Sequence, residues 1–441
     1  MDELLLAKID RAIEEAREAL AKDTMRLVSI KSVKEAPAPG APFGAGPKKV
    51  LDTVLEMGKA EGFYTTDYEV GVVSLSMQEG QPDLGIWLHG DVVPEGEGWI
   101  HAPYDPIEYK GCIIGRGATD NKGQLCAIFH LLKIFKEMNI PLKFNPALYV
   151  GSNEETGMED VQAFLKEYDP PRLSLVPDSS FPVGYGGKGG MHITFRSKKP
   201  FDGLTITAGQ PQTPGKAVAN LYGRTILTNS PPRHGANPDP NGNMITMLAN
   251  RLLEEPLAAE MKQVLEFFRR TSLDIHGDTF GINRPCPEMK PLTVFAQRID
   301  MEDGCPALTV NIRYPIGITA EEIVELMGAE AEKSGLTVAR SKFGVKPYLL
   351  DKNQPVIVAL NEISNQITGA DKPPYTLGGG TYAHRLPNAL AFGMDGCLPP
   401  EGYPKGRGSA HGLDELVSLD RLQRAMRIYA RTLLKLNEME W

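Results

Sequence analysis

Short apolar runs alternate with longer stretches of helical periodicity over roughly the first 185 residues. The runs at 85–88, 147–150 and 173–176 are bounded by polar or turn-forming residues, which is typical of buried strands. The apolar run at 125–135 has the length of a helix instead. This alternation predicts an α/β fold with a mainly parallel sheet and helices on both faces.

The pattern changes after Gly190. Residues 191–197 alternate between apolar and polar, and residues 292–301 and 306–315 read as half-buried antiparallel strands. Helical patterns lie at 243–253 and 319–335. We therefore expect an inserted α+β lid domain at 188–346, and a discontinuous catalytic domain made of 1–187 and 347–441.

Composition narrows the class of protein. The 441 residues are 41% hydrophobic and 23% charged, as in an ordinary globular protein, and no apolar run reaches transmembrane length. Residues 1–30 carry acids and bases throughout, which predicts an amphipathic helix and not a signal peptide. A net charge of −9 argues against nucleic acid as a partner. Five scattered cysteines without a CxxC pair indicate reduced thiols and a cytoplasmic location.

Three of the predicted strands end in metal-binding residue types. The first runs into His89 and Asp91, the second into Glu154 and Glu155, and the third into Asp178. Because ligand sites in open α/β sheets lie beyond the carboxyl ends of the strands, we expect these groups to converge.

Two further candidates, Asp120 and His411, each precede a predicted helix. Taken singly, Asp120 is an ordinary helix N-cap and His411 an ordinary helix-start residue. Together with the acids at the strand ends they would crowd negative charge, which bound dications relieve. Imidazole and carboxylate ligands without a thiolate suit zinc, with manganese or cobalt as alternatives, and a bridging carboxylate suits two ions better than one.

The ordered segments HGDVVPEGEGW, GRGATDNKGQ, SNEETG, PDS and AHGLDE closely resemble the M20 family of metallopeptidases. The segment LGGGTYAHRLPNALAFG resembles the PepV or Sapep-like (Xaa-His type) dipeptidase branch of that family. The resemblance implies one metal ion on His89, Asp120 and Asp178, and a second on Asp120, Glu155 and His411. Asp120 would bridge the ions and precede a cis peptide bond to Asn121.

The resemblance also implies roles around the two ions. Asp91 would orient the His89 imidazole, and Glu154 would be the general base for a water that bridges the metals, as its place beside the ligand Glu155 also suggests.

Within the lid, the resemblance implies that His234 stabilises the oxyanion and that Arg313 grips the substrate carboxylate. Gly379 and Gly380 are further candidate substrate contacts. The family's usual lid asparagine has no clear counterpart, and Gln212 lies nearest to that position.

The leading hypothesis is a cytoplasmic dipeptidase, monomeric or homodimeric, that cleaves dipeptides with both termini free. An N-acyl-amino-acid deacylase or carboxypeptidase of the same family is the alternative enzyme. A metal-dependent peptide-binding protein without turnover is the alternative of another class. Such a protein would lack the general base, yet Glu154 is present.

Overall fold

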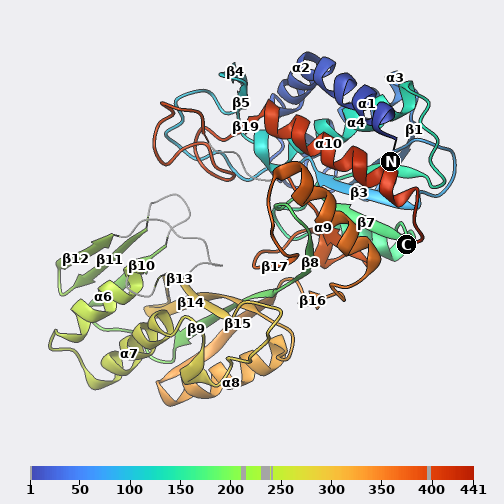
Figure 1. The fold of residues 1–441 in the computed structure, drawn as a ribbon. Coiled ribbons are helices and arrows are strands. Elements are labelled where there is room, and N and C mark those ends of the chain that lie inside the picture. Colours follow the sequence, from blue (N-terminus) through green and yellow to red (C-terminus); the bar gives the residue numbers. More distant parts are fainter. Residues whose placement is uncertain (1, 210–214, 230–238, 240–241, 395–398) are drawn as a thin grey trace. The chain divides into compact units, whose positions relative to one another are not determined.

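The computed structural model describes residues 2–209, 215–229, 239, 242–394 and 399–441. These residues form two compact units. The first unit comprises Met1–Tyr185, Leu350–Tyr375 and Thr381–Trp441, and the second comprises Gly186–Leu349 and Thr376–Gly380 (Figure 1).

A mixed sheet with a parallel centre organises the first unit. Its strand order is β1-β2-β6-β3-β7-β18-β8-β16, with β17 paired to β8. The pairs β3–β6, β3–β7 and β7–β18 are parallel, and the pairs β1–β2, β2–β6, β8–β18 and β8–β16 are antiparallel. The strands are β1 (Tyr64–Asp67), β2 (Val72–Ser76), β3 (Leu84–His89), β6 (Pro146–Gly151), β7 (Leu173–Val176), β8 (Gly184–Gly187), β16 (Tyr348–Leu349), β17 (Tyr375–Leu377) and β18 (Ala389–Ala391). Of these, β16 and the last two residues of β8 and of β17 fall within the second unit's ranges.

Every residue of β3 and β6 is buried, as expected for central strands covered on both faces. Helix α4 packs on β3 and β6, while α3 and α5 pack on β2. Helices α1, α2, α4 and α10 pack against one another (Figure 1). The helices of this unit are α1 (Glu3–Glu15), α2 (Arg17–Val28), α3 (Ala45–Ala60), α4 (Gly123–Glu137), α5 (Glu159–Glu167), α9 (Pro355–Thr368) and α10 (Leu419–Leu436).

A small antiparallel sheet in the same unit joins segments that are far apart in the sequence. It has the order β19-β5-β4, made of β4 (Ile107–Tyr109), β5 (Cys112–Ile114) and β19 (Leu416–Ser418). This pairing brings the chain after His411 next to the chain that leads to Asp120.

An antiparallel sheet with helices packed against it forms the second unit. The strand order is β12-β11-β10-β13-β14-β9-β15. Burial alternates along β10, which is typical of a sheet with one covered face. The strands are β9 (Gly189–Ser197), β10 (Leu204–Ala208), β11 (Lys216–Leu221), β12 (Arg224–Asn229), β13 (Thr293–Glu302), β14 (Cys305–Tyr314) and β15 (Leu336–Phe343), and the helices are α6 (Met244–Leu253), α7 (Ala259–Leu273) and α8 (Ala320–Lys333).

The predicted fold class, a parallel-centred α/β domain with an α+β domain, is confirmed. The second unit begins and ends two to three residues outside the predicted 188–346, and it also takes in 376–380. The single helix expected at 1–30 is two helices that meet at Ala16. Each helix of the described residues is too short or too polar to span a membrane.

Candidate metal centre

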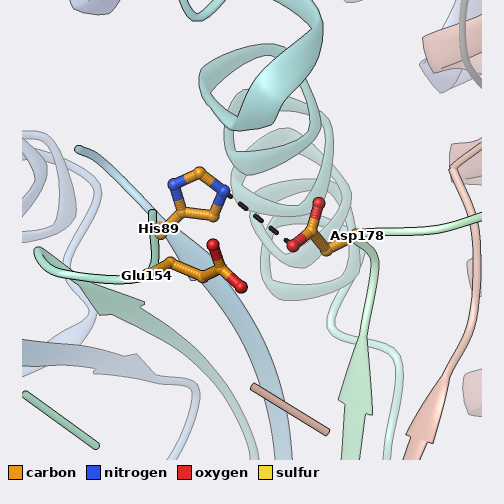
Figure 2. A group of neighbouring side chains, drawn as sticks. All are labelled: His89, Glu154 and Asp178. Atoms are coloured by element: carbon orange, nitrogen blue, oxygen red, sulfur yellow. Dashed lines mark ion pairs between the residues drawn. The ribbon is translucent and has the colours of Figure 1, made fainter. Parts of the chain in front are cut away.

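The carboxyl ends of three neighbouring strands carry the candidate ligands of the first unit. Strand β3 ends at His89, β6 leads into the turn with Glu154 and Glu155, and β7 leads to Asp178. Because β6, β3 and β7 are adjacent and parallel, these ends share one edge of the sheet. Figure 2 shows His89, Glu154 and Asp178 side by side at this edge.

The carboxylate of Asp120 lies between two imidazoles. Its Oδ1 is 3.0 Å from Nε2 of His89, and its Oδ2 is 3.0 Å from Nε2 of His411. The Asp120–Asn121 peptide bond is cis, as the resemblance implied. One oxygen facing each histidine is the arrangement that a carboxylate bridging two ions requires.

Each imidazole also has an acidic neighbour of its own. His89 Nε2 lies 3.9 Å from Asp178 Oδ2 (Figure 2), and His411 Nε2 lies 3.0 Å from Glu155 Oε1. These contacts place Asp178 beside His89 and Glu155 beside His411, with Asp120 between the two histidines.

Ligand atoms within 4.8 Å of one another also define two overlapping groups of three side chains. One group is His89, Glu154 and Asp178, and the other is His89, Asp120 and Glu155. Glu154 therefore lies close enough to be a ligand, whereas the sequence reasoning gave it the role of a base.

The acids of the site are buried together, and their charges repel. Burial and the neighbouring Asp178 raise the pKa of Glu154 well above its ordinary value. Burial and the nearby Asp120 raise the pKa of Asp178 to about 7. Hydrogen bonds to Asp120 and Glu155 raise the pKa of His411 to about 11. These shifts all favour bound protons, so the cluster attracts positive charge.

The donor set fits two divalent ions. Two imidazoles and three carboxylates supply nitrogen and oxygen ligands, which suit zinc, manganese or cobalt. The Oε1 atom of Glu154 is buried and has no hydrogen-bond partner among the described residues, although a buried carboxylate oxygen ordinarily has one. That atom is therefore available to a group bound at the site.

Asp91 supports the site in a way that the sequence did not reveal. Its Oδ1 and Oδ2 accept hydrogen bonds from the backbone N–H groups of Glu154 and Glu155, each at 3.1 Å. The Nδ1 atom of His89 lies 3.0 Å from the backbone oxygen of Asp91 and 3.5 Å from its Oδ1. The backbone of Asp91 is thus the nearer partner of the imidazole, and its carboxylate fixes the acidic turn.

The turn has a second anchor, which the sequence reasoning missed. Oδ2 of the buried Asp160 accepts hydrogen bonds from the backbone N–H groups of Ser152 (2.8 Å) and Asn153 (2.9 Å) and from the hydroxyl of Tyr382 (2.5 Å). A Cβ atom at Gly151 would lie 1.9 Å from that hydroxyl, so this position requires glycine. The sequence signal was present, since Tyr382 lies in the segment LGGGTYAHRLPNALAFG.

The second unit holds Arg313, Gly379 and Gly380. The Nε atom of Arg313 donates to Oδ1 of Asn311 at 3.1 Å, and Asn311 also contacts Nε2 of His192 at 2.8 Å. Burial lowers the pKa of Arg313, and no carboxylate of the described residues forms an ion pair with it. Space around a Cβ at Gly379 is open.

The structure therefore brings together part of the predicted set. His89, Asp91, Asp120, Glu154, Glu155, Asp178 and His411 converge within the first unit. Arg313, Gly379 and Gly380 belong to the second unit. His234 and Gln212 lie outside the described residues.

Comparison with known families and proteins gives consistent matches. The family model of peptidase family M20/M25/M40, which describes its sequences, matches residues 86–435 of this chain. "Putative dipeptidase YtjP" of Bacillus subtilis is 28% identical over 462 residues, covering 95% of this chain and 97% of that protein. A "Putative dipeptidase" of Staphylococcus epidermidis is 27% identical, covering 94% and 96%.

Solved structures with the same fold include two dipeptidases. The dipeptidase Dug1p of Saccharomyces cerevisiae aligns with a TM-score of 0.66 at 13% identity, covering 99% of both chains. Human carnosine dipeptidase 1 aligns with a TM-score of 0.65 at 14% identity, also covering 99% of both. At these identities the likeness shows the fold alone.

Substituting Tyr382→Phe tests the second anchor of the acidic turn. Because the hydroxyl donates to a buried carboxylate, we expect the free energy of unfolding to fall by about 1.5–3 kcal/mol. We also expect about tenfold weaker binding of divalent metal, since the turn carries Glu155. Chemical denaturation and chelator competition measure the two effects.

Tyr429→Phe is the matched control. Tyr429 is equally buried, and its hydroxyl donates to the backbone oxygen of Phe392, away from the turn. This variant should lose stability but keep its metal affinity. Equal metal affinity in the two variants would contradict the anchoring role of Tyr382.

Proposed function

The chain belongs to peptidase family M20/M25/M40, and we propose that it is a two-metal dipeptidase that cleaves dipeptides with free termini. One observation carries the proposal. The two carboxylate oxygens of Asp120 each face a different histidine, His89 or His411, at 3.0 Å. A single carboxylate placed in this way can serve two ions at once.

We assign His89, Asp120 and Asp178 to one ion and Asp120, Glu155 and His411 to the other. Zinc is the first candidate, with manganese or cobalt as alternatives. When bound, the ions would polarise the scissile carbonyl and lower the pKa of a water molecule in the site.

Glu154 is the proposed general base. Its Oε1 atom is buried and no described residue forms a hydrogen bond with it, and the raised pKa of Glu154 makes it a better proton acceptor than an exposed glutamate. Glu154 would accept the proton of the attacking water and pass it to the leaving amine. Asp91 would hold Glu154 in place through the backbone hydrogen bond to its N–H group.

Arg313 is the proposed ligand for the substrate carboxylate. Its Nε atom donates to Asn311, and among the described residues neither terminal nitrogen has a hydrogen bond or an ion pair, so both could bind a carboxylate bidentately. The resemblance adds His234 as an oxyanion donor and Gly379 and Gly380 as substrate contacts. The acids around Glu154 and Asp178 would bind the free amino group.

Glu154→Gln should keep both metal ions and lose turnover. The change removes a proton acceptor, and general-base catalysis is worth about 10²–10⁴-fold in kcat. Dipeptide hydrolysis and elemental metal analysis, run on the same preparation, measure the two properties. Near-normal kcat at full metal content would exclude Glu154 as the base, and a loss of metal would make it a ligand instead.

Asp120→Ala should release both ions, because its two oxygens serve both ligand sets. His411→Ala is the matched comparison, since it should weaken one ion and spare the other. Metal content after gel filtration should approach zero and one ion per chain, respectively. Two tightly held ions in Asp120→Ala would rule out a bridging carboxylate.

Arg313→Ala should reduce kcat/KM for unmodified dipeptides about 10- to 100-fold, since a charge-assisted bidentate contact is lost. Amidating the C-terminus of the substrate should cost the wild-type enzyme a similar factor and the variant much less. Arg196→Ala is the control, because Arg196 lies in the same sheet but already pairs with Asp303.

N-Acetylated substrates separate the dipeptidase from the deacylase. A dipeptidase that binds the free amino group should cleave N-acetyl dipeptides poorly. Rapid release of acetate from N-acetyl amino acids, with dipeptides left intact, would replace the dipeptidase by the deacylase.

A further inference from the structure

We propose that Glu415 and Arg116 are positioning residues that hold Asp120 and His411 at the separation required by two metal ions. Neither residue belongs to the ligand sets. The inference rests on the proposed ligands, but it concerns the buried pair behind them.

Glu415 holds the backbone of the bridging ligand. Its side chain is fully buried, and Oε1 accepts hydrogen bonds from the backbone N–H groups of Thr119 (2.9 Å) and Asp120 (3.0 Å). The other oxygen, Oε2, pairs with Nη1 of Arg116 at 2.6 Å. The glutamate and Asp120 are 295 positions apart in the sequence, so this contact ties two distant loops together.

Arg116 links the same ion pair to the backbone of His411. Its Nη2 atom donates to the backbone oxygens of Glu95 (3.3 Å) and His411 (3.4 Å). Its guanidinium lies over the ring of Trp99, 5.1 Å from the centroid. One ion pair thus contacts the main chain of both Asp120 and His411.

The backbone of Asp120 needs this support, because its angles are not helical. Asp120 has extended backbone angles (φ −136°, ψ 86°) just before α4, so the helix ladder does not fix it. Both of its carboxylate oxygens are engaged at 3.0 Å, and a small backbone shift would displace the two together. Charge-assisted hydrogen bonds from backbone N–H groups to a buried carboxylate are strong enough to hold such a position.

The neighbouring Asp414 provides a control of nearly identical character. It is also fully buried, accepts hydrogen bonds from two successive backbone N–H groups, those of Ile100 (2.9 Å) and His101 (3.2 Å), and pairs with Arg407. The two backbone partners, Ile100 and His101, lie in a loop that carries none of the proposed ligands. Asp414→Asn therefore repeats the chemical change of Glu415→Gln without touching Asp120.

The test compares Glu415→Gln with Asp414→Asn in the full-length holoenzyme. We expect Glu415→Gln to bind zinc about 10- to 100-fold more weakly, the usual effect of losing a group that orients a metal ligand. Asp414→Asn should keep wild-type zinc affinity. Competition with a zinc chelator gives the affinities, and KM at saturating zinc should stay unchanged in both variants, since neither residue contacts substrate.

Arg116→Lys carries the test further, and it replaces Glu415→Gln if that variant does not fold. Lysine keeps the charge beside Glu415 but has no second nitrogen to reach His411. We expect weaker binding of the ion held by His411 and Glu155, with the other ion retained.

Wild-type affinity for both ions in folded Glu415→Gln or Arg116→Lys would overturn the proposal, as would an equal loss in Asp414→Asn. Failure of the ligand assignment itself is distinguishable, because Asp120→Ala would then retain its metal.

Discussion

The repulsion among buried carboxylates at one sheet edge is the constraint on which the rest of the site depends. Asp120, Glu154, Glu155 and Asp178 are held close together, and burial raises the pKa of three of them. Asp120 alone has a lowered pKa, because His89 and His411 donate hydrogen bonds to it and outweigh the effect of burial. A fold that gathers these charges without a cation would lose stability as each carboxyl group ionised. Divalent ions bound by these residues would supply the missing charge and would account for the burial of the cluster.

The same hydrogen-bonding arrangement recurs in the loops around this cluster. A buried carboxylate accepts hydrogen bonds from two successive backbone N–H groups and thereby fixes the local chain without regular secondary structure. Ordinary helix or strand ladders cannot do this at the ends of strands, where the ligands must turn toward one another. Four carboxylates accept such pairs of backbone hydrogen bonds: Asp91 from Glu154 and Glu155, Asp160 from Ser152 and Asn153, Asp414 from Ile100 and His101, and Glu415 from Thr119 and Asp120.

Sequence reasoning identified the candidate ligands more readily than the residues that hold their backbone in place. His89 and Asp178 were predictable because strand length, burial and parallel pairing together dictate which residues reach the sheet edge. The role of Glu415 was not predictable, because its contact with Thr119 spans 296 positions of the sequence. The contact of Asp160 with Tyr382 spans 222 positions, and only the motif around Tyr382 pointed to it. The break at Ala16 also escaped prediction, since the apolar periodicity continues through it.

The two units divide the chemistry of the proposed reaction. All candidate metal ligands and Glu154 belong to the first unit, whereas Arg313 belongs to the second. Arg313 is partly buried, its Nε is fixed by Asn311, and the described residues offer its charge no ion pair. Burying an arginine without a partner costs stability, so the position is best understood as prepared for an anion that arrives with the substrate. Gly190 pairs with Arg313 on the neighbouring strand and leaves room for the guanidinium group of Arg313. A Cβ atom at Gly190 would lie only 2.5 Å from Nη1 of that arginine. In the proposed reaction, metal affinity and substrate selectivity would therefore be set by separate parts of the chain, and changes around Arg313 would alter the preferred substrate while leaving the proposed metal ligands intact.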